Sequence, residues 1–188
     1  MKQFGIICPA MTTEVKLCFY KTYVRPILQY GMDNIVLNNE QCRSIQTLES
    51  RLIKAMFMVS NKMTRSTKLV LACNIDNEIN TRIKIKINFG KRLVSLQSTR
   101  KLIQAIEKND KLARMDKKNF FYEIGFLTNN VDNTFEGMIN SGLNMVYEAR
   151  ARNRTERAKQ EVRQVIDALK LIGPKRTEML KKLLKIEL

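Results

Sequence analysis

The sequence predicts an all-α protein, an irregular bundle of about seven to nine helices that ends in an αα-hairpin. Two observations favour this fold class. Apolar residues recur at spacings of three and four along most of the chain, as they do on one face of a helix. Prolines, which interrupt helices, occur at only three of the 188 positions. A chain of this length suits one domain, or one domain with an appendage.

The first expected helix begins at Thr12 or Thr13, whose hydroxyl can cap the first turn. Pro26 cannot donate a backbone hydrogen bond and disfavours helical geometry at Arg25, so we expect the helix to end or kink there. Gly31 then permits a turn. The residues that share one face of this helix, at three- and four-residue spacing, are Val15, Cys18, Phe19 and Thr22.

The next segments also predict helices. A second helix starts at Asn38 or Asn39, and a short one lies within 64–74. Residues 82–89 alternate strictly, as a half-buried strand would, but isoleucines at every fourth residue from 75 to 87 favour a helix. Because the helical spacing covers more residues, we predict a helix there and another over 98–108. The apolar stripe expected on the second helix consists of Ile45, Leu48, Leu52, Ala55 and Val59.

The C-terminal part predicts the αα-hairpin. Thr155 can cap a helix that ends near Gly173, and Pro174 suits the first turn of the following helix. The residues expected to face inward are Ala158, Val162, Val165, Leu169 and Ile172 on the first helix and Leu180, Leu183 and Leu184 on the second.

One motif, from Lys16 to Gly31, resembles a known family. It is similar to the segment that follows the catalytic palm in reverse transcriptases of non-LTR (LINE-type) retrotransposons, where it opens the thumb-like part. The likeness continues through 46–54 and fades beyond about Leu93, so it covers the first half of the chain. The family usually has an aromatic residue, often Trp, after the Tyr-Gly pair, and this chain contains no Trp. The matching residues are Lys16, Leu17, Tyr20, Lys21, Val24, Arg25, Pro26, Ile27, Leu28, Tyr30 and Gly31.

Charge and this resemblance together predict three consecutive segments. Residues 1–118 form a thumb-like basic helical domain, and 149–188 form the basic αα-hairpin. Between them, 119–148 contains no Lys or Arg and is rich in aromatic residues, so we interpret it as a packing or partner-docking segment. The four acids of this segment are Glu123, Asp132, Glu136 and Glu148.

The net charge of +16 predicts a polyanionic partner. Nucleic acid ranks first, before an acidic membrane surface and an acidic protein. The resemblance implies a grip on a template-primer helix, so we expect backbone contacts to structured RNA. The candidate RNA-binding residues are Lys21, Arg25, Arg51, Lys54, Arg82, Lys84, Lys86, Lys91, Arg92, Arg150, Arg152, Arg154 and Arg157.

The sequence predicts neither catalysis nor a metal or cofactor site. It has no histidine and no glycine-rich phosphate loop, and the carboxylates that hold magnesium in reverse transcriptases lie in the palm, upstream of the resemblance. The segment Tyr30–Asn34 has only one acid and is not expected to be catalytic. The four cysteines lack metal-ligand spacing, which indicates buried free thiols in a reducing compartment.

We therefore expect a non-catalytic RNA-binding protein related to a retroelement thumb, a structural subunit or bound factor of a large ribonucleoprotein such as a ribosome. Other proteins of that particle are expected partners, and a membrane is not. The absence of a secretory signal and of a membrane-spanning stretch predicts an intracellular protein of the cytoplasm or nucleus. Two alternatives stay open, a fragment of an active retroelement polymerase and a helical scaffold that binds acidic protein.

Overall fold

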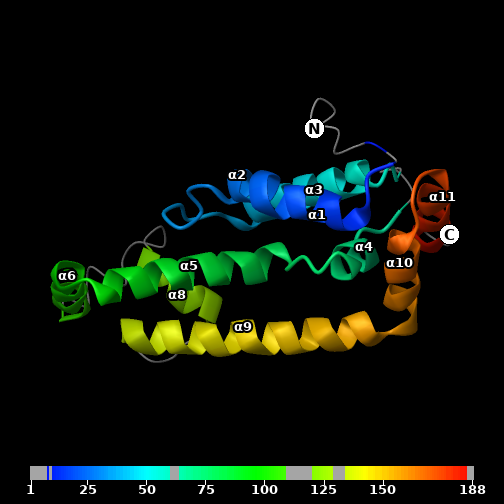
Figure 1. Ribbon diagram of the computed structural model, residues 1–188. Coiled ribbons are helices and arrows are strands. Elements are labelled where there is room, and N and C mark those ends of the chain that lie inside the picture. Colours follow the sequence, from blue (N-terminus) through cyan, green and yellow to red (C-terminus); the bar gives the residue numbers. More distant parts are fainter. Residues whose placement is uncertain (1–7, 9, 60–63, 109–119, 129–133, 186–188) are drawn as a thin grey trace. The chain divides into compact units, whose positions relative to one another are not determined.

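The protein is an all-α helical bundle, as the sequence predicts (Figure 1). The computed structural model describes residues 8, 10–59, 64–108, 120–128 and 134–185, and no strand occurs among them. The chain forms two compact units whose parts alternate along the sequence. Unit 1 comprises 1–29, 40–77 and 152–188, and unit 2 comprises 30–39 and 78–151.

This division differs from the three consecutive segments that the sequence predicts. The expected boundary after residue 148 lies close to the observed one between 151 and 152, and both fall inside one continuous helix, α9 (Phe135–Ala158). The expected boundary at 118 lies outside the described residues. The units interleave because helices far apart in the chain share each core, which a scan of charge along the sequence does not detect.

Unit 1 has one apolar core formed by its N-terminal, middle and C-terminal parts. An antiparallel bridge joins Thr64 to Lys185. The elements of unit 1 are α1 (Thr13–Phe19), the π-helical turn η1 (Tyr20–Val24), α2 (Arg25–Gln29), α3 (Asn39–Met56), α4 (Thr67–Ala72), α10 (Gln160–Lys170) and α11 (Pro174–Leu184). The core includes Tyr20, Ile53, Met56, Phe57, Leu69, Val165, Leu169, Leu180 and Leu184.

Of the two outcomes expected at Pro26, an end or a kink of the helix, the structure excludes the end. Arg25 keeps helical dihedrals, and α2 continues through Gln29. The reason is the π-helical turn before the proline, in which the Arg25 N–H donates to the Tyr20 carbonyl five residues back. This wider turn relieves the contact that a proline ring makes in a regular helix. Gly31 makes the expected turn, with a φ of +76°.

Two predicted apolar faces are wrong. On α1, Thr13 and Lys16 are buried, whereas the expected Val15 and Phe19 are 41% and 38% exposed. On α3 the buried line runs through Cys42, Glu49, Ile53 and Met56, so it is displaced from the predicted stripe and Leu48 is exposed. In both helices a polar side chain occupies the inner face because it has a partner inside the unit.

The C-terminal hairpin is confirmed with a different start. Thr155 lies within α9, and α10 begins only after Lys159, whose backbone is extended. Gly173 adopts a φ of +70° between the helices, and Pro174 is the first residue of α11, as expected. The buried apolar side chains of the hairpin are Val162, Val165, Ala168, Leu169, Leu180 and Leu184, whereas Ala158 and Ile172 are exposed.

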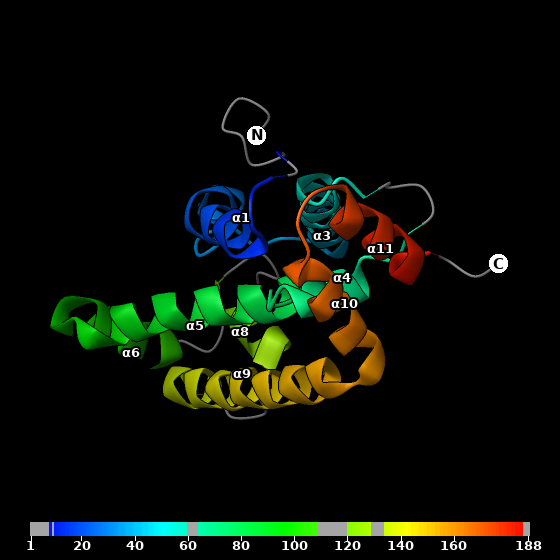
Figure 2. The ribbon, with the colours of Figure 1, turned by 45° about the vertical axis from the view of Figure 1, so that its right-hand side comes forward.

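Unit 2 is built around α5 (Glu78–Ser95), which confirms the helical interpretation of 82–89. The helix α6 (Gln97–Lys108) follows it, and α8 (Phe120–Thr128) lies between α5 and α9 (Figures 1 and 2). The buried core consists of Ile83, Ile87, Ile103, Ile124, Phe135 and Ile139.

The close approach of α9 to α5 and α8 depends on Gly142. A Cβ at this position would lie 2.2 Å from Ile87 Cδ1 and 2.9 Å from Thr128 Cγ2. Gly125 of α8 differs, because a Cβ there would meet only Met138, at 3.7 Å. A side chain therefore fits at 125 and does not fit at 142.

We expect Gly142→Ala to lower the free energy of unfolding by about 1–3 kcal/mol, because Ile87 and Thr128 must move to admit the methyl group. Gly125→Ala is the matched control and should be neutral or stabilising by up to about 1 kcal/mol, since alanine favours a helix over glycine. Urea unfolding followed by circular dichroism measures both. Equal effects of the two substitutions would contradict the packing described for α9.

Candidate nucleic-acid interface

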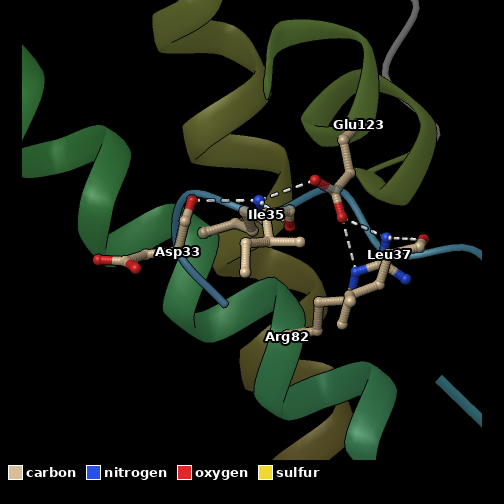
Figure 3. A network of polar contacts seen from close by, with 6 residues as sticks. Asp33, Ile35, Leu37, Arg82 and Glu123 are labelled. Carbon is tan, nitrogen blue, oxygen red and sulfur yellow. Dashed lines mark hydrogen bonds and ion pairs between the residues drawn. The ribbon is translucent and has the colours of Figure 1, made fainter. Parts of the chain in front are cut away.

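Two of the predicted RNA-binding cations are buried in unit 2 and paired with Glu123 (Figure 3). Arg82 donates its Nε to Glu123 Oε1 at 2.7 Å and also contacts it through Nη2. Lys86 Nζ lies 2.8 Å from Glu123 Oε2. All three side chains are at least nine-tenths buried. The two cations come from successive turns of α5, so one carboxylate on α8 holds both.

The same cations fix the segment that leads from Gly31 towards α3 (Figure 3). Arg82 Nη2 donates to the Leu37 carbonyl at 2.7 Å. Lys86 Nζ donates to the carbonyls of Asp33, at 3.1 Å, and Ile35, at 2.9 Å. These donors satisfy backbone carbonyls that would otherwise need water. Arg82 and Lys86 therefore stabilise unit 2 by joining α5 to α8 and to this segment.

In unit 1, Arg25 and Tyr20 share the carboxylate of Glu49. Arg25 Nε lies 2.9 Å from Glu49 Oε1, and Tyr20 donates its hydroxyl to the same oxygen at 2.8 Å. Arg25 also donates to the Asp76 carbonyl at 2.7 Å. Burial, and then the charge of Glu49, raise the pKa of Tyr20 well above its usual range. The tyrosine is thus a neutral donor inside the core.

Lys16 and Lys54 are buried as donors to backbone carbonyls. Lys16 is fully buried and donates to the Met56 carbonyl at 2.6 Å, and its ammonium lies over the Phe57 ring. Burial, and then the charge of Arg176, lower the pKa of Lys16 to about 8. Lys54 donates to the Thr64 carbonyl, and burial lowers its pKa as well.

Lys21 and Arg157 meet at the C-terminal end of α4. Lys21 Nζ donates to the Cys73 carbonyl at 3.0 Å, and Arg157 Nη2 to the Ala72 carbonyl at 3.4 Å. The last carbonyls of a helix lack intrahelical donors and attract positive charge. Both side chains therefore contribute to unit 1, although Lys21 as a residue is exposed.

The remaining predicted cations lie at the surface. Lys84 is half-buried, and Arg92 is exposed but contacts Asp33 at 3.3 Å and the Phe89 ring. Three of the exposed cations lie on α9, within a stretch of five consecutive residues. Of these remaining predicted cations, the exposed ones that form no ion pair within the described part of the chain are Arg51, Lys91, Arg150, Arg152 and Arg154.

Sequence reasoning missed that several cations are internal. Lys16 was recognised only as a position of the reverse-transcriptase motif, and Arg176 received no role. Arg176 is almost fully buried, donates to the Met11 carbonyl at 3.0 Å and lies over the Phe57 ring. A signal was present for Lys16, because it falls at helical spacing between Thr13 and Tyr20, both of which are buried.

The acidic aromatic segment is largely packed. Phe120 contacts the rings of Phe89, Phe121 and Phe135 at centroid distances of 5.2 to 6.0 Å. Lys86 lies over the Phe120 ring, which ties this cluster to the Glu123 pair. Phe126 is 65% exposed and stacks on Tyr122. Four phenylalanines of this region thus pack together, whereas Phe126, Tyr122 and Tyr147 are exposed.

The thiols only partly follow expectation. Cys42 and Cys73 are buried, and burial raises the pKa of Cys73 to about 12, whereas Cys8 and Cys18 are exposed. All four are free. Within the described residues, no three of the acids and cysteines gather as a metal ion would require. None of the described helices combines the length and apolar character needed to cross a lipid bilayer.

Comparison with known proteins returns no relative: no protein-family model, no curated protein and no solved structure matches this chain.

We expect Glu123→Gln to lower the free energy of unfolding by about 3–5 kcal/mol, because it leaves two buried cations without a carboxylate. Glu148→Gln, at an exposed position of α9, is the control for loss of one negative charge and should change stability by less than about 0.5 kcal/mol. Chemical denaturation measures both. A Glu123→Gln effect as small as that of the control would show that the pairing does not stabilise unit 2.

Lys16 predicts a specific pH dependence of stability. Below about pH 8 this lysine is protonated in both states, whereas between about 8 and 10.5 only the unfolded chain retains the proton. The free energy of unfolding therefore rises with pH over that window. We expect wild type to gain about 1–3 kcal/mol relative to Lys16→Met between pH 7.5 and 10, since Tyr20 and Cys73 titrate alike in both proteins. A constant difference would contradict the lowered pKa of Lys16.

Proposed function

We propose that this protein binds structured RNA through backbone phosphates, without catalysis, and that its principal contact is the exposed arginine cluster of α9, defined as Arg150, Arg152 and Arg154. The observation that carries the proposal is the contrast between these three side chains and the other candidates. Arg25, Lys54, Arg82 and Lys86 are bonded to acceptors inside the protein, whereas the arginine cluster is exposed.

The geometry of the cluster suits a backbone. Arg150 and Arg154 are four residues apart and lie on one side of α9, whereas Arg152 projects from another side. Guanidinium groups bind phosphate through paired N–H donors and retain their charge at any physiological pH. A regular helix with such side chains can follow phosphates along A-form RNA, which is recognised by shape rather than by base edges.

The net charge of +16 supports the same proposal. When cationic side chains bind a nucleic acid, they release the counterions condensed on its phosphates, and this release favours binding. An isolated acidic protein surface releases fewer counterions. The resemblance to the retroelement thumb agrees with a grip on an RNA-containing duplex. We accordingly propose a structural subunit or bound factor of a large ribonucleoprotein, such as a ribosome, in the cytoplasm or nucleus.

The cations of the Lys16–Gly31 motif are not proposed as RNA contacts. Three cations of the Lys16–Gly31 motif, namely Lys16, Lys21 and Arg25, donate to protein oxygens in unit 1. The motif therefore stabilises this unit, and the proposed RNA contact lies on α9 instead.

We expect Arg150→Gln, Arg152→Gln and Arg154→Gln, combined in one variant, to weaken binding to a fluorescent RNA hairpin at least tenfold near 0.1 M salt and to reduce the salt slope by about 2–3. Fluorescence anisotropy over a series of KCl concentrations measures both quantities. The slope falls because fewer phosphates are neutralised.

The matched control neutralises three exposed lysines of α11, namely Lys175, Lys181 and Lys182, and loses the same net charge. A clearly smaller effect of this control identifies α9 as the contact. Equal losses would mean that only total charge matters, and no binding to the hairpin at low salt would refute the RNA proposal. Competition by polyglutamate as strong as by RNA would favour an acidic protein partner instead.

A further inference from the structure

Unit 2 contains an open pocket where the end of α5, the start of α6 and the first turns of α9 meet. We call it the α5–α6–α9 pocket. Its volume is about 340 Å³, within the range of small-molecule sites. The lining residues are Lys91, Val94 and Ser95 of α5, Arg100 of α6, and Glu136, Ile139 and Asn140 of α9.

Two cations of this pocket face solvent. Arg100 donates its Nε to the Val94 carbonyl at 3.0 Å, which anchors the guanidinium at the pocket wall. Lys91 is exposed on the neighbouring turn of α5. Within the described residues, neither cation forms an ion pair with a carboxylate, unlike the buried cations Arg82 and Lys86. The pocket thus retains positive charge for an external anion.

Glu136 restricts the kind of anion that fits. Its carboxylate accepts hydrogen bonds and donates none, so it repels a simple phosphate or sulfate. The ligand must carry a negative group for Lys91 and Arg100 together with donors for Glu136. Ribose hydroxyls are such donors, and an acidic side chain that accepts from ribose hydroxyls is a recurrent arrangement in nucleotide sites. Only a ribonucleotide offers the 2′-hydroxyl, which distinguishes it from a deoxyribonucleotide.

The rest of the pocket suits a base. Val94, which is half-buried, provides apolar surface against which part of a base can pack. Asn140 carries an amide that can both donate to and accept from a base edge. Ser95 adds a hydroxyl oxygen beside them, and its own proton is donated to the Arg92 carbonyl. One pocket thus offers cations for a phosphate, an acceptor for ribose hydroxyls and apolar surface for a base.

We infer that the α5–α6–α9 pocket binds one ribonucleotide unit, with its phosphate on Lys91 and Arg100 and its ribose hydroxyls on Glu136. The inference rests on the proposed RNA function when the bound nucleotide belongs to an RNA strand. It stands without that function when the ligand is a free mononucleotide. In an RNA strand, the pocket selects ribose over deoxyribose, which the arginine cluster of α9 cannot do through phosphates alone.

The test compares Glu136→Gln with Glu148→Gln in the full-length protein. Each variant removes one carboxylate from α9, and electrostatics alone would strengthen binding to any polyanion in both. We expect Glu136→Gln instead to weaken binding to a labelled single-stranded RNA about three- to tenfold, because a neutral amide oxygen replaces the charged acceptor of the ribose hydroxyls. Binding to DNA of the same sequence should follow the control. Fluorescence anisotropy measures the affinities, and thermal unfolding verifies that both variants are folded.

A second measurement separates the pocket from the proposed RNA function. The ¹⁵N-labelled protein is titrated with adenosine monophosphate and with its 2′-deoxy analogue. Shifts at the amides of Lys91, Arg100 and Asn140 that are larger for the ribonucleotide than for the deoxyribonucleotide, by a margin that shrinks in Glu136→Gln, support the pocket even if long RNA does not bind. If RNA binds but Glu136→Gln behaves like Glu148→Gln, the inference fails while the RNA function stands. If neither RNA nor mononucleotide binds, both fail.

Discussion

The carboxylate of Glu123 is the contact on which unit 2 most depends. Three segments that are distant in sequence, namely 33–37, α5 and α8, meet at Arg82, Lys86 and this acid. Burying two cations beside one carboxylate leaves a net positive charge in the interior, and the backbone carbonyls of 33–37 offset it with their dipoles. Removal of the acid would leave both cations without their counter-ion, so α5, α8 and this segment form one electrostatic group.

Positive charge has two separate uses in this chain. One set of cations lies inside and satisfies carboxylates or carbonyls, as Lys16, Arg25 and Lys86 do. Another set, which includes the arginine cluster of α9, lies at the surface. The net charge of +16 counts both sets alike. It therefore overstates the charge available to a partner, because each internal cation has already exchanged its hydration for protein acceptors.

The proposed contacts differ in what they can recognise. Surface arginines on α9 would position a phosphate backbone and would not read the sugar or the base. The α5–α6–α9 pocket combines cations, a carboxylate and apolar surface, and such a mixture can distinguish one nucleotide chemistry from another. Two such elements together would combine affinity with selectivity. Neither requires a catalytic group, since each acts through complementary charge and hydrogen bonding.

The sequence by itself determined the fold class and most helices, including α5 over the ambiguous 82–89, because local apolar spacing fixes helical periodicity. It also placed the turn at Gly31 and the start of α11 at Pro174, which depend on backbone geometry alone. Only the tertiary structure decided which face of α3 is buried, that Pro26 is accommodated by a π-helical turn, and which cations are internal. Lys84 and Lys86 each lie between two isoleucines, yet Lys84 is half-buried and Lys86 is fully buried. Their difference arises from Glu123, which lies far along the chain, and a residue's partner across such a distance is not encoded in the spacing around it.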